Sequence, residues 1–348
     1  MLEAINFDSD IDDDAEGPFD DPMGDIILRS SDEVDFRTHK IFLVHASPVF
    51  KDMLSLPQGD KTTGDARPPV VVMHENAEEV RILLLLCYPG TALKTPESLK
   101  RLWKIYCLAD KYMLDSVKLW LRSCLKQFER WSPACVYLIA RRAGWREEAK
   151  SAAERSLLHT LTEMTRSNHP ILETAPAKHL QDLFRYHRQR SEILSKYMDP
   201  REWARNWEFG RSHDDEHGKD VFMVSDKHCC LKIYHVPEVQ EVMPGYYVYV
   251  KSWWCDFMSD CSEALAQRPS LAGISVADIS RRAVAVAAHC RKCGPVAQDQ
   301  IENFWSLVLI DAPRDFYVGI HSFPPSFTRL LMTVSMIRTT VFVSIKRP

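Results

Sequence analysis

The stretch that decides the fold reads GDIILRSSDEVDFRTHKIFLVHASPVFKDMLSLP and spans residues 24–57. Residues 26–28 form a continuous apolar run, which predicts a strand covered on both faces. Residues 30–33 predict a turn, and the alternating polarity of residues 34–37 predicts the second strand of a hairpin. Residues 40–46 predict a short helix.

Helix and strand signals continue beyond this hairpin. Ser47 is a good N-cap and Pro48 suits the first helical position, so a second helix is predicted to begin there. Residues 70–73 are rich in β-branched side chains and predict a buried strand, and Asn76 can cap the helix that follows. Further helices are predicted near residues 99–113, 117–128, 145–160 and 177–198, with another one opening at Ser132-Pro133.

Residues 24–130 resemble a BTB/POZ domain of the fungal type. The resemblance rests on the stretch quoted above, on PVVVMHENAEEVRILLLLCYPG at residues 69–90 and on LADKYMLDSVKLWLRSCL at residues 108–125. It implies an α+β BTB/POZ fold, a small mixed sheet flanked by helices, followed here by a mostly α-helical extension. It also implies a protein–protein interaction module that commonly self-associates, and in many members an adaptor for cullin-based ubiquitin ligases.

The resemblance also assigns roles to individual residues. Asp25 and His39 match scaffold positions, and we expect Asp25 to accept backbone hydrogen bonds at the hairpin and His39 to anchor the start of the helix. The helix matching residues 47–56 forms part of the cullin-facing surface in the family. On it Phe50, Met53 and Leu54 share one apolar stripe, which can be core or partner surface. Apolar helical spacing favours core, with Phe50 the more buried and Met53 the more exposed.

Composition narrows the class of protein. The 348-residue chain has a formal net charge of −4 and lacks a dense Lys/Arg run, which argues against nucleic acid as a partner. Its first residues do not resemble a secretory signal, and no apolar run is long enough to cross a membrane. We therefore expect a cytoplasmic or nuclear protein whose 10 cysteines are thiols or metal ligands rather than a disulfide framework.

The sequence divides into regions of different character. Residues 1–24 contain nine acidic side chains and no Lys or Arg, which predicts a disordered tail. In the last region, helices are predicted near residues 252–267, 275–292 and 295–310. The predicted organisation is a disordered acidic tail (1–23), the BTB/POZ domain (24–130), a helical extension (131–210), a linker (211–220), a cysteine-containing helical region (221–312) and an irregular tail (313–348).

Cysteines in the last helical region suggest a metal site. His289-Cys290-x-x-Cys293 occurs together with His228-Cys229-Cys230, and a C-x-x-C knuckle can place two thiolates on one zinc ion. If the two helices over residues 252–292 pack antiparallel, Cys255 approaches Cys293. The predicted ligand set is Cys255, Cys261, Cys290 and Cys293, as a structural zinc site. The second knuckle is missing, so buried thiols without metal are the favoured alternative.

No pattern in the chain predicts catalysis. There is no nucleophile elbow and no strand–glycine-rich-turn–helix unit, so we expect a non-enzyme without catalytic residues and with no cofactor beyond the zinc considered above. The expected partners are proteins, including itself and a cullin scaffold, and neither nucleic acid nor a membrane. The alternatives are a BTB-type transcriptional regulator without its own DNA-binding element and a structural zinc-binding scaffold.

Overall fold

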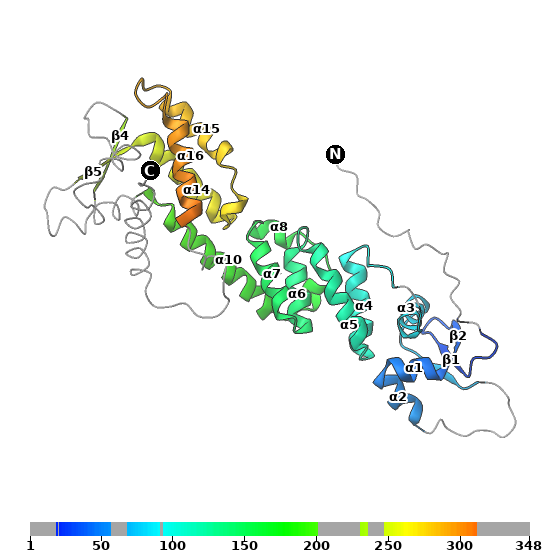
Figure 1. Ribbon diagram of the computed structural model, residues 1–348. Coiled ribbons are helices and arrows are strands. Elements are labelled where there is room, and N and C mark those ends of the chain that lie inside the picture. The colour runs from blue at the N-terminus through cyan, green and yellow to red at the C-terminus, as the bar shows by residue number, and fades with distance from the viewer. Residues whose placement is uncertain are drawn as a thin grey trace, which may run out of the picture. The chain divides into compact units, whose positions relative to one another are not determined.

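The computed structural model describes residues 19, 21–56, 68–90, 93–200, 230–235 and 247–311 (Figure 1). It divides into two compact units, Met1–Phe128 and Glu129–Pro348, and each is considered by itself. The predicted linker at residues 211–220, the C-terminal tail at 313–348 and most of the acidic tail lie outside the described residues.

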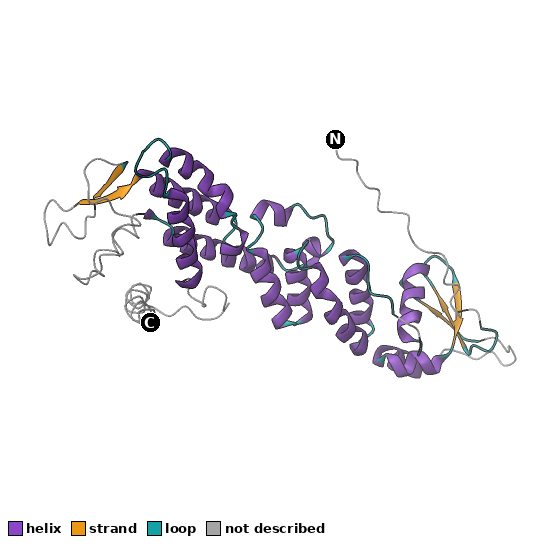
Figure 2. Ribbon diagram, turned by 45° about the horizontal axis from the view of Figure 1, so that its top comes forward, coloured by secondary structure: helices purple, strands orange, loops and turns teal. Residues whose placement is uncertain are grey.

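The first unit contains a small mixed sheet in the order β2-β1-β3. Strand β1 (Ile26–Arg29) pairs antiparallel with β2 (Asp35–Thr38) and parallel with β3 (Val70–Val72). The predicted α+β fold, a small mixed sheet with helices followed by a mostly helical part, is confirmed. In Figure 2 strands occur in only two places within the described residues, this sheet and a two-stranded sheet in the second unit.

Two predictions about strand burial were wrong. Strand β1 was expected to be covered on both faces, but Ile26 and Leu28 are fully buried while Ile27 is half-buried. Strand β3 was expected to be buried, but Val70 is 42% and Val72 is 73% exposed. Among the described strands β3 pairs with β1 alone, so it lies at the edge of the sheet. A β-branched composition predicts a strand without fixing its place in the sheet.

Two helices of the first unit begin at the caps that the sequence predicts. Ser47 Oγ accepts a hydrogen bond from Phe50 N at the start of α2, and Asn76 forms a capping box with Glu79 at the start of α3. Ser98, which was not predicted as a cap, accepts a hydrogen bond from Arg101 N at the start of α4. The elements are α1 (Lys40–Ala46), α2 (Pro48–Ser55), α3 (Ala77–Cys87), α4 (Leu99–Lys111), α5 (Asp115–Leu125) and the 3₁₀ helix η1 (Lys126–Phe128).

A buried polar network joins the sheet region to the end of α4. The Glu75 carboxylate, 5% exposed, accepts hydrogen bonds from Tyr112 Oη at 2.9 Å and from the Lys111 ammonium. Ser47 Oγ donates to the Tyr112 carbonyl at 2.6 Å, which ties α2 to the same point. Burial alone would raise the pKa of Glu75, but the hydrogen bonds from Lys111 and Tyr112 outweigh it and hold the pKa below its ordinary value.

Glu75→Gln should therefore destabilise the first unit by about 1–3 kcal/mol at neutral pH, because Lys111 and Tyr112 lose a charged acceptor in a buried site. The pKa of Glu75 is lower in the folded chain than in the unfolded one, so its carboxylate stabilises the fold at pH values above the unfolded-state pKa. This stabilisation is lost as the pH falls through the folded-state pKa. The difference between wild type and variant should thus shrink in acid. Chemical denaturation of the full chain at several pH values measures this, with the exposed Glu97→Gln as the control.

The second unit begins with a helical hairpin. Helices α6 (Pro133–Ala143) and α7 (Arg146–Ser156) pack on one another and are joined through Gly144, whose φ of 75° ends α6 in the left-handed region. Two short helices follow, α8 (Leu161–Thr165) and α9 (Ile171–Thr174). The long helix α10 (Ala177–Tyr197) then buries Leu183, His187, Arg190 and Leu194.

The region predicted to be helical over residues 221–312 also contains strands. Strand β4 (Leu231–His235) pairs antiparallel with β5 (Tyr247–Lys251), and β5 leads directly into α14 (Ser252–Gln267). The sequence did not predict β4. The 3₁₀ helix η2 (Leu271–Gly273) and the helices α15 (Val276–Ala287) and α16 (Ala297–Asp311) complete the described part of this unit.

Helix α14 lies at the centre of this second core. It packs against α10, α15 and both strands, and it buries Trp253, Phe257 and Met258 completely. The aromatic ring of Phe304 on α16 lies edge-on to Phe257 at 6.3 Å. Trp254, next to Trp253 on α14, is also buried in this core.

A buried histidine connects α10 to the turn after α7. His187 is 2% exposed, and its Nε2 donates to the His159 carbonyl at 2.9 Å. Burial lowers the pKa of His187 below its ordinary value, and this hydrogen bond only partly opposes the effect.

The second unit should therefore lose stability as the pH falls below about 6.5, where the unfolded chain binds a proton that the buried imidazole resists. His187→Gln removes that titration while keeping a side-chain donor, so its unfolding midpoint should vary less with pH than that of wild type. Calorimetry of the full chain between pH 5 and 8 measures the slope. An equal slope in both proteins would contradict this account.

Candidate functional site

The start of α1 is held by a residue next to β1. The Asp25 carboxylate accepts a hydrogen bond from Lys40 N, the first residue of α1, at 2.7 Å. His39 occupies the N-cap position, but its side chain makes no capping bond. Its Nε2 lies 3.6 Å from the Asp21 carboxylate, and its Nδ1 lies 3.4 Å from Tyr88 Oη. Of the two scaffold residues, Asp25 is therefore the one that caps the helix.

The apolar stripe of α2 divides into a core residue and flanking residues. Phe50 is fully buried and stacks on the ring of Tyr112, with centroids 4.9 Å apart. It therefore belongs to the core and offers no area to a partner. Met53 and Leu54 are half-buried, and Leu56, directly after the helix, is 64% exposed.

Residues before the predicted domain start also pack into the first unit. Phe19 is 4% exposed, and its ring lies edge-on to that of Tyr88 at 5.4 Å. The acidic residues around Phe19 had placed it in a disordered tail, and a single aromatic side chain among them gives too weak a signal to set the boundary.

A family model matches the part of the chain that folds in the order β1-β2-α1-α2-β3-α3. The BTB/POZ domain model matches residues 19–129. Residues 19–129 are a BTB/POZ domain. No curated protein matches the chain. The BTB/POZ domain is a non-catalytic protein–protein interaction module, which implies protein partners for the chain. The fungal type remains a prediction.

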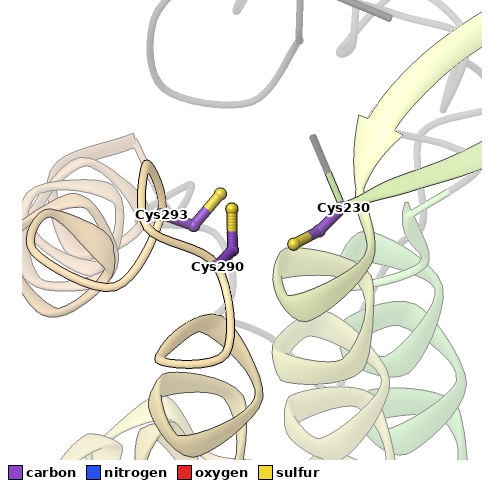
Figure 3. Close-up of side chains that lie close together, drawn as sticks. All are labelled: Cys230, Cys290 and Cys293. Carbon is purple, nitrogen blue, oxygen red and sulfur yellow. The ribbon is translucent and has the colours of Figure 1, made fainter. Parts of the chain in front are cut away.

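Three cysteines meet at one end of the second core. The Sγ atoms of Cys230, Cys290 and Cys293 all lie within 4.8 Å of one another. Figure 3 shows Cys230, directly before β4, pointing toward the turn that carries the other two cysteines. Cys290 and Cys230 are half-buried and Cys293 is 2% exposed.

The other two predicted ligands lie elsewhere. Cys255 and Cys261 are fully buried on α14, within the apolar core, and neither belongs to the group of three. Burial raises the pKa of Cys261 to about 12, which keeps its thiol protonated. The predicted ligand set lacks Cys230, because the position of this cysteine depends on the pairing of β4 with β5. His228 and Cys229 lie outside the described residues.

A shallow, open depression lies between α14 and α15. It is lined by Asp260, Glu263, Asp278 and Arg282 among others, and Arg282 pairs with Asp260 at 3.3 Å. Burial raises the pKa of Asp260, although Arg282 opposes this.

Among the described helices, none combines the length and the apolar character that a bilayer span requires.

Phe50→Ala should cost about 3–5 kcal/mol of stability in the first unit, because it removes a buried ring from its stack on Tyr112. Met53→Ala should cost clearly less, because part of that side chain is already in contact with water. Denaturant unfolding of both full-length variants tests the division of the stripe. Equal losses of stability would mean that it is wrong.

Proposed function

We propose that this chain is an adaptor: its BTB/POZ domain binds the cullin scaffold of a ubiquitin ligase, and its helical unit binds a second protein. The observation that carries the proposal is the BTB/POZ domain over residues 19–129. Domains that resemble it in this way often serve as such adaptors, and the scaffold-facing surface in the family includes the helix that corresponds to α2.

The surface that we assign to the scaffold is centred on Met53 and Leu54. Each side chain is half-buried against its own domain, so one side is already packed and little rotamer freedom is left to lose on binding. Leu56 adds a further exposed apolar side chain at the end of the helix. Methionine is enriched in interfaces, and the burial of apolar area supplies a binding energy that depends weakly on salt.

The neighbouring charges fit an apolar interface with a polar rim. Lys51 and Asp52 are both exposed on α2, and their charges have opposite signs. The charges of these two residues therefore offset one another, so binding should not depend on long-range electrostatic attraction. Partner affinity on this surface should follow apolar area rather than net charge.

Met53→Asp and Leu54→Asp should each weaken binding to a purified cullin scaffold by about tenfold or more, because a carboxylate in the contact costs at least about 1.4 kcal/mol. Biolayer interferometry with the immobilised full chain measures Kd. Circular dichroism of each variant establishes that the domain remains folded, and Met53→Gln serves as a milder variant if the aspartate unfolds it.

The matched control places the same charge on another exposed apolar residue of the domain. Leu119, on α5, is 66% exposed, so Leu119→Asp should leave both folding and cullin affinity unchanged. The proposal fails if the wild-type chain does not bind the scaffold, or if folded Met53 and Leu54 variants bind it as tightly as wild type does.

A further inference from the structure

Two segments far apart in the sequence bring three thiols together in the second unit. Cys230 lies directly before β4, whereas Cys290 and Cys293 lie in the connection between α15 and α16. Their Sγ atoms lie within 4.8 Å of one another (Figure 3). A disulfide would use two sulfur atoms, but the fold brings three to one point.

Backbone hydrogen bonds hold Cys230 and Cys293 in place. The carbonyl of Cys230 accepts from Ser252 N, the first residue of α14, at 2.8 Å. The carbonyl of Cys293 accepts from Ala297 N, the first residue of α16, at 3.0 Å. The thiols are therefore positioned by the same bonds that start two of the core helices.

The Cys-x-x-Cys turn is closed by a glycine. Gly294 N donates to the Cys290 carbonyl at 2.9 Å. A Cβ atom at residue 294 would lie only 3.2 Å from that same carbonyl oxygen. The turn therefore favours glycine directly after Cys293, and its tight closure keeps Cys290 and Cys293 on one side.

We propose that Cys230, Cys290 and Cys293 bind a structural zinc ion, which ties the start of β4 and α14 to the α15–α16 connection. Zinc bound at about 2.3 Å from each sulfur places tetrahedral ligands about 3.8 Å apart, within the separation found here. Binding converts three thiols into zinc-bound thiolates and releases three protons to solvent, so the zinc–thiolate unit has a net charge of −1. The three cysteines fill three of the four tetrahedral positions.

The surroundings favour a cation at this point. Cys293 is 2% exposed and belongs to the apolar core, where a thiolate without a compensating positive charge would be costly. Zinc, which takes sulfur ligands in tetrahedral structural sites, fits this donor set better than calcium or magnesium, which prefer oxygen.

The test is the zinc content of the full chain, purified under reducing conditions and dialysed against a zinc-containing buffer and then against buffer alone. Mass spectrometric elemental analysis should find about one zinc per wild-type chain. Cys230→Ser, Cys290→Ser and Cys293→Ser should each lose most of it. Cys261→Ser is the matched control, because Cys261 is buried in the same core outside the cluster, and it should retain the zinc.

Cobalt substitution gives a second readout. Cobalt bound by three thiolates produces sulfur-to-metal charge-transfer absorption, which should weaken in each cluster variant and persist in Cys261→Ser. If the cluster variants do not fold, alkylation of the thiols of the wild-type chain tests the proposal instead. Added zinc should protect these three cysteines from alkylation and leave the alkylation of the other cysteines unchanged. Absence of zinc from the wild type, retention of zinc by the cluster variants, or equal alkylation with and without zinc would each overturn the proposal.

Discussion

Strand β1 has a hydrogen-bonded partner on both edges, and the architecture of the first unit depends on that position. Its antiparallel partner follows through a short turn, but a parallel partner requires a crossover, which α1 and α2 provide between β2 and β3. Asp25, directly before β1, caps α1 at 2.7 Å, so the residue that precedes the central strand also fixes the start of the crossover. The crossover in turn presents α2, the helix that we assign to a partner.

The second unit is organised around a helix rather than a strand. Helix α14 packs against α10, α15 and both strands of the small hairpin, and it contributes the largest buried side chains of the core. Serine hydroxyls reinforce the contact with α10, since Ser191 Oγ donates to the Ala266 carbonyl at 2.8 Å and Ser262 Oγ donates to the Ser195 carbonyl at 3.0 Å. The cysteine cluster lies where α14 begins, so a metal there would add a cross-link at the end of the helix that the core depends on.

Local signals in the sequence predicted most elements of the first unit, whereas features set by tertiary neighbours were missed. Ser47-Pro48 and Asn76 fix helix starts through bonds within three residues, so sequence alone finds them. The exposure of Val72 depends on the order of strands in the sheet, which no local pattern encodes. Cys230 lies near Cys290 because the pairing of β4 with β5 places it beside the start of α14, and β4 itself was not predicted.

The stripe on α2 explains why an apolar pattern could not separate core from surface. Spacing at i, i+3 and i+4 places side chains on one face of the helix. The rest of the domain covers only part of that face. Phe50 lies in the covered part, where its ring stacks on that of Tyr112. Ser47 holds Tyr112 in place by donating a hydrogen bond to its carbonyl. Met53 and Leu54, which continue the same face, are left half-covered. Their partial exposure is thus a consequence of how the core closes around Phe50, and the partner surface that we propose depends on that closure.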